Sequence, residues 1–152
     1  MDHKKDQWET PADLYAQLDA EFGFTLDPCA SAENAKCAKY FTYEMGGLSR
    51  DWGTERVFVN PPYSSPKLAF WMRKAYTASL AGALVVCLVP ASTDTNWFHT
   101  YALRGEIRFI RGRVKFSNGN GDAPAPAPFA SLVVVFRPPN SVQSIAETPG
   151  RP

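Results

Sequence analysis

The chain has 152 residues, of which 45% are hydrophobic and 20% are charged, and its formal net charge is +1. Domains commonly contain about 100–150 residues, so this length predicts a single domain. No apolar run approaches the roughly 18 residues that a membrane span needs, and no secretory signal is recognisable at the N-terminus. We therefore expect a cytoplasmic protein. The low net charge argues against a protein that coats nucleic acid but allows a local basic surface.

The cysteines are odd in number and lack C-x-x-C spacing: Cys29, Cys37 and Cys87. This pattern favours free thiols in a reducing compartment over a disulfide framework. Cysteine and histidine nowhere cluster at the spacing of metal ligands, so no metal site is predicted.

The first third of the chain predicts a helix, a strand and an irregular segment. Thr10-Pro11 is typical of a helix start with Thr10 as N-cap, and Gly23 is a suitable stop. A short strand over residues 24–31 should end at Asp27-Pro28, because proline cannot extend a ladder. Residues 32–52 indicate a short helix and a Gly46-Gly47 turn, without a recognisable second strand.

The rest of the chain alternates between strands and helices. Strands are predicted at 56–60, 83–91, 106–116 and 131–136, and helices at 67–80 and about 95–103. The run 83–91 is continuously apolar, as in a strand buried on both faces of a parallel sheet. Residues 117–129 are rich in Gly, Asn and Ala-Pro, which predicts a mobile loop or a polyproline-like arm. Residues 138–152 predict a disordered tail.

Residues 60–63, Asn-Pro-Pro-Tyr, follow a predicted strand, at the position where α/β folds bind ligands. Proline fixes φ and has no N–H, so the Pro61 carbonyl and the Asn60 side-chain oxygen form two rigid acceptors. Two acceptors suit an exocyclic NH2 group and stabilise the positive charge that develops on it during attack. Tyr63 offers a face for an unstacked base, worth roughly 1–3 kcal/mol. The alternative is a simple turn with Tyr63 in the core.

With this motif, the chain resembles the S-adenosylmethionine-dependent amino methyltransferases, whose signature is (Asp/Asn/Ser)-Pro-Pro-Tyr at a strand end. It is most similar to the phage-type, Dam-like DNA adenine-N6 methyltransferases. The resemblance covers residues 7–137 and is carried by QWETP, LDPCAS, DW, VFVNPPYS, LVPAST followed by Trp-Phe, and GRVKF leading to PFASLVVVF.

The resemblance implies an α/β fold with a Rossmann-like, mostly parallel sheet of about five strands and a β-hairpin-like C-terminal part. One compact domain would span residues 1–137. The implied cofactor is S-adenosyl-L-methionine, the implied partner is DNA, and the location is the host cytoplasm if a phage encodes the chain. The oligomeric state is not indicated.

The resemblance also implies roles for individual residues. The catalytic residues would be Asn60, Pro61, Pro62 and Tyr63. Thr10, with Trp8 alongside, would lie near the methionine carboxylate of the cofactor. Asp27, Pro28, Cys29 and Ala30 would line the cofactor, while Asp51 and Trp52 would hold its adenine. For Asp51 and Trp52 the alternative is a turn aspartate followed by a core tryptophan.

The sequence departs from the usual methyltransferase pattern at two points. Pro28-Cys29-Ala30-Ser31 stands where many members have a Gly-rich loop, and no acid for the ribose is apparent beyond the candidates Glu33 and Glu44. For DNA the candidates are Arg111, Arg113, Lys115 and Phe129, the last as a clamp for the flipped base. The alternative for the basic residues, including Arg108, is a solvated strand edge.

The reading favoured by the sequence is methylation of adenine N6 in DNA. The same motif would serve cytosine N4, an RNA adenine or a glutamine amide in a protein. A further alternative is a non-catalytic binding module whose Ala-Pro arm recruits a partner.

Overall fold

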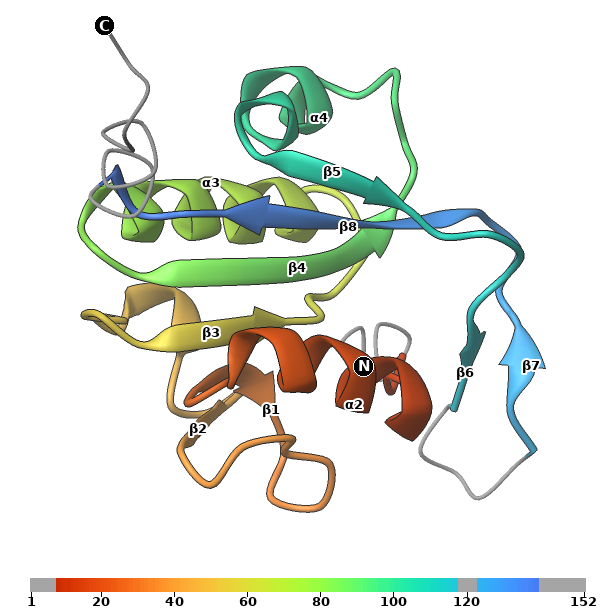
Figure 1. Ribbon diagram of the computed structural model, residues 1–152, viewed down its shortest axis with the longest axis horizontal. Coiled ribbons are helices and arrows are strands. Elements are labelled where there is room, and N and C mark those ends of the chain that lie inside the picture. The colour runs from red at the N-terminus through yellow and green to blue at the C-terminus, as the bar shows by residue number, and fades with distance from the viewer. Residues whose placement is uncertain (1–7, 118–122, 140–152) are drawn as a thin grey trace, which may run out of the picture.

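The computed structural model describes residues 8–117 and 123–139 and has a mixed α/β architecture, as predicted (Figure 1). The central sheet has the strand order β3-β4-β8-β5, with bounds Arg56–Val59, Leu84–Pro90, Ser131–Phe136 and Glu106–Phe109. Strands β3 and β4 are parallel, whereas β8 runs antiparallel to both β4 and β5. Two two-stranded sheets accompany it. The paired strands thus form smaller and more mixed sheets than the mostly parallel sheet that was expected.

Strands β1 (Asp27–Ala30) and β2 (Tyr40–Thr42) form a parallel pair beside the edge of the central sheet. A bridge from Leu26 to Val57 connects β1 to β3. The prediction that this strand ends at Asp27-Pro28 is wrong, because β1 begins there. The missing N–H of Pro28 is tolerated because the register of β1 with β2 shifts between Asp27 and Ala30. Strand β2 escaped prediction because three residues show no periodicity.

Two apolar clusters lie on opposite faces of the central sheet. Helices α3 (Lys67–Leu80) and α4 (Asn96–Thr100) cover one face, and α2 (Ala12–Phe22) lies on the other (Figure 1). Along β4, Val85, Cys87 and Val89 enter the first cluster, while Val86 and Leu88 enter the second. Burial on both faces explains why the sequence of β4 is continuously apolar, as predicted.

Helix α2 has the predicted extent but not the predicted N-cap. Gly23 terminates it in the left-handed region, with φ of 62°, and donates its N–H to the Asp19 carbonyl. At the other end Pro11 occupies the N-cap position without a side-chain hydrogen bond. Thr10 does not cap the helix because its hydroxyl is engaged by Asn60, a residue distant in sequence. Helix α3 likewise begins without a side-chain cap.

The strand predicted over residues 106–116 is two strands, β5 and β6 (Lys115–Phe116). Gly112 adopts a φ of +78° in the bend between them, a conformation that glycine adopts readily. Strand β6 pairs antiparallel with β7 (Ala125–Pro126), so the described part of the Ala-Pro segment is a paired arm. The helix predicted over about 95–103 is α4 followed by the 3-10 turn η2 (Ala102–Arg104).

The predicted tail lies outside the described residues from position 140 onward. Within the described ranges, no helix combines the length and apolar character that crossing a bilayer demands.

Candidate active site

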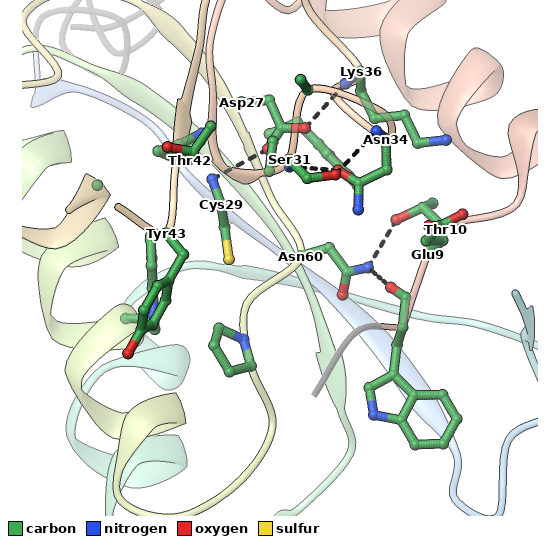
Figure 2. Close-up of a pocket in the computed structure, with 18 of the residues that line it drawn as sticks. Glu9, Thr10, Asp27, Cys29, Ser31, Asn34, Lys36, Thr42, Tyr43 and Asn60 are labelled. Atoms are coloured by element: carbon green, nitrogen blue, oxygen red, sulfur yellow. Dashed lines mark hydrogen bonds between the residues drawn. The ribbon is translucent and has the colours of Figure 1, made fainter. Parts of the chain in front are cut away.

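A cavity of about 590 Å³ lies at the carboxyl ends of β1 and β3 (Figure 2). Small-molecule sites commonly measure about 300–1,000 Å³. Its wall combines residues 8–10, β1 with the following loop, the segment after β2, the end of β3 and the start of α3. The structure thereby brings together most of the residues predicted for catalysis and cofactor binding: Trp8, Thr10, Asp27, Pro28, Cys29, Ala30, Asn60 and Pro62.

Asn60 contributes a carboxamide whose orientation is fixed by the N-terminal segment. Its Nδ2 donates to the Trp8 carbonyl oxygen and, at 3.0 Å, to Thr10 Oγ1. The Trp8 carbonyl can only accept a hydrogen bond, so the nitrogen and not the oxygen must face it. Figure 2 shows the Asn60 oxygen on the side of the amide away from Thr10. The side chain therefore presents an acceptor to its surroundings.

Tyr63 is half-buried and does not line the cavity. Its hydroxyl lies 2.7 Å from Asn60 Oδ1 and 3.0 Å from the Leu88 carbonyl oxygen, and its one hydrogen serves either acceptor. Burial raises the pKa of this hydroxyl well above its ordinary value, so it stays protonated. Because a carboxamide oxygen has two lone pairs, Asn60 Oδ1 keeps capacity for a second hydrogen.

The two prolines of the motif differ in position. Pro61 is buried and does not line the cavity, whereas Pro62 lines it beside Asn60.

Asp27 organises the loop that follows β1. Its Oδ1 accepts from the Cys29 N–H at 3.2 Å and its Oδ2 from the Lys36 N–H at 3.0 Å. Burial raises the pKa of this carboxyl above its ordinary value, although the two N–H bonds act in the opposite direction. Both oxygens are used to hold residues 29–36 against the cavity. The remaining lone pairs of these oxygens can accept hydrogen bonds from a ligand.

The same loop contains a reciprocal turn between Ser31 and Asn34. The Ser31 N–H donates to Asn34 Oδ1 at 2.7 Å, and the Asn34 N–H donates to Ser31 Oγ at 3.2 Å. These bonds fix the conformation of the loop that follows β1.

Asp51 and Trp52 do not line the cavity, although the resemblance implied that they hold the cofactor's adenine. Asp51 is exposed, and its Oδ1 accepts from the Gly53 N–H in a turn. Trp52 is buried and its Nε1 donates to the Gly47 carbonyl oxygen at 3.0 Å. This arrangement matches the alternative of a turn aspartate and a core tryptophan. Trp52 contacts two residues that do line the cavity, Gly47 through its hydrogen bond and Trp71 through ring stacking.

Acidic side chains outnumber basic ones around the cavity. The carboxylates are Glu9, Asp27, Glu33 and Glu44, and the ammonium groups are Lys36 and Lys67. Such a wall favours a ligand that carries positive charge. Both ribose candidates from the sequence, Glu33 and Glu44, are among these residues.

The DNA candidates are grouped near the β6–β7 arm. Arg111, Arg113 and Lys115 are exposed, and Arg113 also donates to the Ala127 carbonyl oxygen at 3.3 Å. Phe129 is half-buried, with its ring centroid 5.6 Å from that of Tyr63 and 5.7 Å from that of Trp8. The predicted base clamp therefore contacts the predicted catalytic motif.

Arg108 differs from the other basic residues of this segment. It forms a bidentate pair with Glu21, at 2.6 and 2.7 Å, and a further ion pair with Glu106 at 2.6 Å. Its guanidinium joins β5 to α2, so the structure assigns it to the fold.

A family model described as DNA N-6-adenine-methyltransferase (Dam) matches residues 1–149 of the chain. The chain belongs to this family. Among curated relatives, the DNA N-6-adenine-methyltransferase of Haemophilus phage HP1 (strain HP1c1) is 32% identical over 139 residues, which cover 88% of this chain and 80% of the relative. That of Escherichia phage T1 is 36% identical over 99 residues, which cover 64% of this chain and 41% of the relative. The match thus spans about two fifths of the T1 protein.

Several cavity residues of this Dam family member were not singled out from the sequence. They follow β1 and β2 or begin α3, and they include Ser31, Asn34, Thr42, Tyr43, Gly47, Lys67 and Trp71. The Ser31-x-x-Asn34 pattern is a readable signal, since both residue types favour local turns. Thr42, Tyr43 and Gly47 depend on β2, which has no signature in the sequence, whereas Lys67 and Trp71 belong to the predicted helix α3.

Proposed function

We propose that this Dam family member transfers a methyl group from S-adenosylmethionine to the N6 amine of adenine in DNA. The observation that carries the proposal is that Asn60, at the end of β3, shares one cavity with Asp27 and the loop after β1. A methyl donor and an amine must meet within such a space for the transfer to occur. The names of the phage relatives support adenine as the base.

We infer that β1 and β2 extend the central sheet, giving the order β2-β1-β3-β4-β8-β5. The bridge from Leu26 to Val57, with the Phe58 N–H donating to the Leu26 carbonyl at 3.0 Å, supports this continuity. In that sheet only β8 runs antiparallel, which fits a Rossmann-like methyltransferase. The cavity then lies at the carboxyl ends of neighbouring strands, as expected for such sheets.

The chemistry of the cavity wall fits the proposed cofactor. S-adenosylmethionine supplies an electrophilic methyl group on a positively charged sulfur, and it also carries an ammonium group. The excess of carboxylates suits both charges. Pro28, Cys29 and Ala30 supply a mainly apolar wall, and Thr10 and Trp8 close the side next to Asn60. Glu33 and Glu44 are the candidates for the ribose hydroxyls.

The transfer itself needs the adenine amine to approach the methyl carbon in line with the carbon–sulfur bond. Asn60 Oδ1 in the cavity wall and the carbonyl of the adjacent, buried Pro61 would each accept one hydrogen of the amine, which would concentrate the lone pair on nitrogen. The lone pair forms the new carbon–nitrogen bond, and the electrons of the carbon–sulfur bond leave with a neutral sulfur. The surplus proton on nitrogen passes to water. Holding both reactants in place supplies much of the rate.

The base must leave the duplex stack to reach this position. Tyr63, with Phe129 against it, provides an aromatic surface for the extruded base. Arg111, Arg113 and Lys115 provide charges for the neighbouring phosphates.

The decisive experiment is incubation of the purified protein with plasmid DNA and tritiated cofactor, followed by mass spectrometry of the nucleosides. We expect N6-methyladenine, and we expect Asn60→Ala to remove most of the incorporation while the affinity for the cofactor changes less than about tenfold. Asn96→Ala, an exposed asparagine at the start of α4, is the matched control and should retain full incorporation.

Other products would reject the proposal. N4-methylcytosine, methylated RNA or methylated protein with unmodified DNA would each identify one of the alternative substrates. A protein that produces no saturable heat with the cofactor in calorimetry would be a binding module.

A further inference from the structure

The amide of Asn60 is held by two acceptors that come from the N-terminal segment. The nitrogen donates one hydrogen to the Trp8 carbonyl and the other to Thr10 Oγ1 (Figure 2). Both hydrogens of the Asn60 NH2 group are therefore consumed inside the protein. The plane of the amide is fixed, and the oxygen is the part that stays available on the other side.

Thr10 is buried, with 4% of its surface exposed, and it does not serve the helix that follows it. The start of α2 has no side-chain cap, although a threonine stands next to its N-cap position. The sequence position favours capping, but the hydroxyl bonds to Asn60 instead. This use of a buried hydroxyl indicates that its orienting contact has a purpose beyond local folding.

We propose that Thr10 and the Trp8 carbonyl form an orienting clamp that holds Asn60 Oδ1 toward the target amine and restricts this position to asparagine. The inference rests on the proposed function. Without the clamp the amide could rotate by half a turn and present its NH2 group to the amine. A donor would then face a donor, and the attacking nitrogen would lose one of its two acceptors.

The clamp also discriminates against aspartate, which the signature of the wider superfamily permits at this position. An ionised aspartate has no hydrogen to donate. One of its oxygens would face the Trp8 carbonyl, so two acceptors would be in contact and this part-buried carbonyl would lose its partner. A protonated aspartic acid has one O–H and can satisfy the Trp8 carbonyl. Activity of the aspartate variant should therefore depend on protonation.

Tyr63 completes the arrangement on the oxygen side. Its hydroxyl donates to Asn60 Oδ1 or to the Leu88 carbonyl, which occupies at most one lone pair of the amide oxygen. The second lone pair accepts from the amine. Thr10 thus acts as a positioning residue through Asn60 and does not itself contact the reacting atoms.

The test combines three variants with single-turnover methylation at saturating cofactor and DNA. Thr10→Val keeps the shape of the side chain and removes the hydrogen-bond acceptor. We expect methyl transfer to be at least tenfold slower in this variant. The calorimetric affinity for the cofactor should stay within about threefold of the native value. Thr10→Ser should restore most of the lost rate. Asn60→Asp should be at least a hundredfold slower than native at pH 8 and should recover progressively as the pH falls toward 5.5.

A measurement that needs neither cofactor nor DNA tests the clamp independently of the proposed function. In the 15N-labelled native protein, the two Asn60 side-chain N–H resonances should be distinct and protected from exchange, and Thr10→Val should abolish that protection. These signals test the clamp even if the native protein leaves adenine unmodified, a result that would reject only the methylation proposal.

Three results would overturn the clamp. The first is a Thr10→Val protein that transfers methyl groups at the native rate. The second is a loss of rate in Thr10→Val that is matched by an equal loss of cofactor affinity, which would make Thr10 a cofactor contact. The third is an Asn60→Asp protein as active as native at pH 8.

Discussion

Gly47 packs its backbone against the carbonyl of Pro28 so closely that a Cβ built on Gly47 would lie 2.1 Å from that oxygen. Both residues line the cavity, and the contact sets the separation of β1 and the segment after β2. Its Cβ would also lie 3.1 Å from a ring atom of Trp71. Gly47 is required here for space, since the oxygen belongs to the backbone and cannot rotate away.

We expect Gly47→Ala to displace β1 at Pro28, to cost roughly 1–3 kcal/mol of folding stability as in other overpacked sites, and to weaken cofactor binding. Calorimetric titration with S-adenosylmethionine measures this loss. Thr77→Ala, an exposed change on α3, should bind as the native protein does. If Gly47→Ala binds the cofactor with native affinity, β1 and the segment after β2 can move apart without affecting the site.

Asp27 should give the protein a pH-dependent stability of known sign. Burial raises the pKa of its carboxyl in the folded state above 3.8, so between the two values the folded protein binds more protons than the unfolded chain. The contribution of Asp27 to stability is therefore greatest below the unfolded pKa and decreases as the pH rises through the folded pKa.

Asp27→Asn removes this titration. Urea unfolding across pH 3 to 7 should show a free energy that falls less steeply with rising pH in the variant than in the native protein. The variant also loses one acceptor for the Cys29 and Lys36 N–H groups, so its cofactor affinity should be lower at every pH. Parallel pH profiles of the two proteins would contradict the assignment.

Arg111 and Arg108 should behave differently toward DNA. Arg111 is exposed on the segment before β6, whereas Arg108 is engaged by Glu21 and Glu106. Arg111→Gln should weaken DNA binding and reduce the slope of log affinity against log salt by about 1. Arg108→Gln should leave that slope unchanged and lower the thermal midpoint slightly. Equal slopes in the two variants would remove Arg111 from the DNA surface.

Phe129 should contribute to binding of the extruded base. Its ring contacts those of Tyr63 and Trp8, and stacking of one base is worth roughly 1–3 kcal/mol. Phe129→Leu should raise KM for DNA by roughly tenfold and leave cofactor affinity unchanged. Phe70→Leu, an exposed phenylalanine of α3, is the matched control. An unchanged KM in Phe129→Leu would restrict this residue to core packing.

The elements whose signals are local could be predicted closely from the sequence. Helix α3 has the predicted bounds because its apolar spacing and its terminators lie within the segment itself. The strand β4 and the end of β3 before Pro61 could also be predicted, because an apolar run and a proline are signals within the segments themselves. The position of Asn60 in the cavity followed from the rule that ligands bind at the carboxyl ends of strands, whereas the places of Asp27 and Thr10 were implied by the family resemblance.

The errors came from contacts between distant parts of the chain. Thr10 has an ideal sequence for a helix cap, but Asn60, 50 residues away, takes its hydroxyl. The sequence could not show whether Trp52 packs in the core or against a ligand, because its burial depends on contacts with Trp71 and Gly47. Strand β2 depends on pairing with β1 and has no periodicity of its own. Long-range competition for a side chain leaves no mark in the nearby sequence.

The indole rings of Trp71 and Trp52 stack with centroids 6.2 Å apart, and Trp71 alone of the two reaches the cavity. Occupation of the cavity changes the polarity around one ring of this pair. The intrinsic ultraviolet emission of the protein is therefore a built-in optical reporter of ligand entry, which needs no dye and no radiolabel. Trp71→Phe should remove the contribution of this pair, whereas Trp8, which also lines the cavity, should still respond.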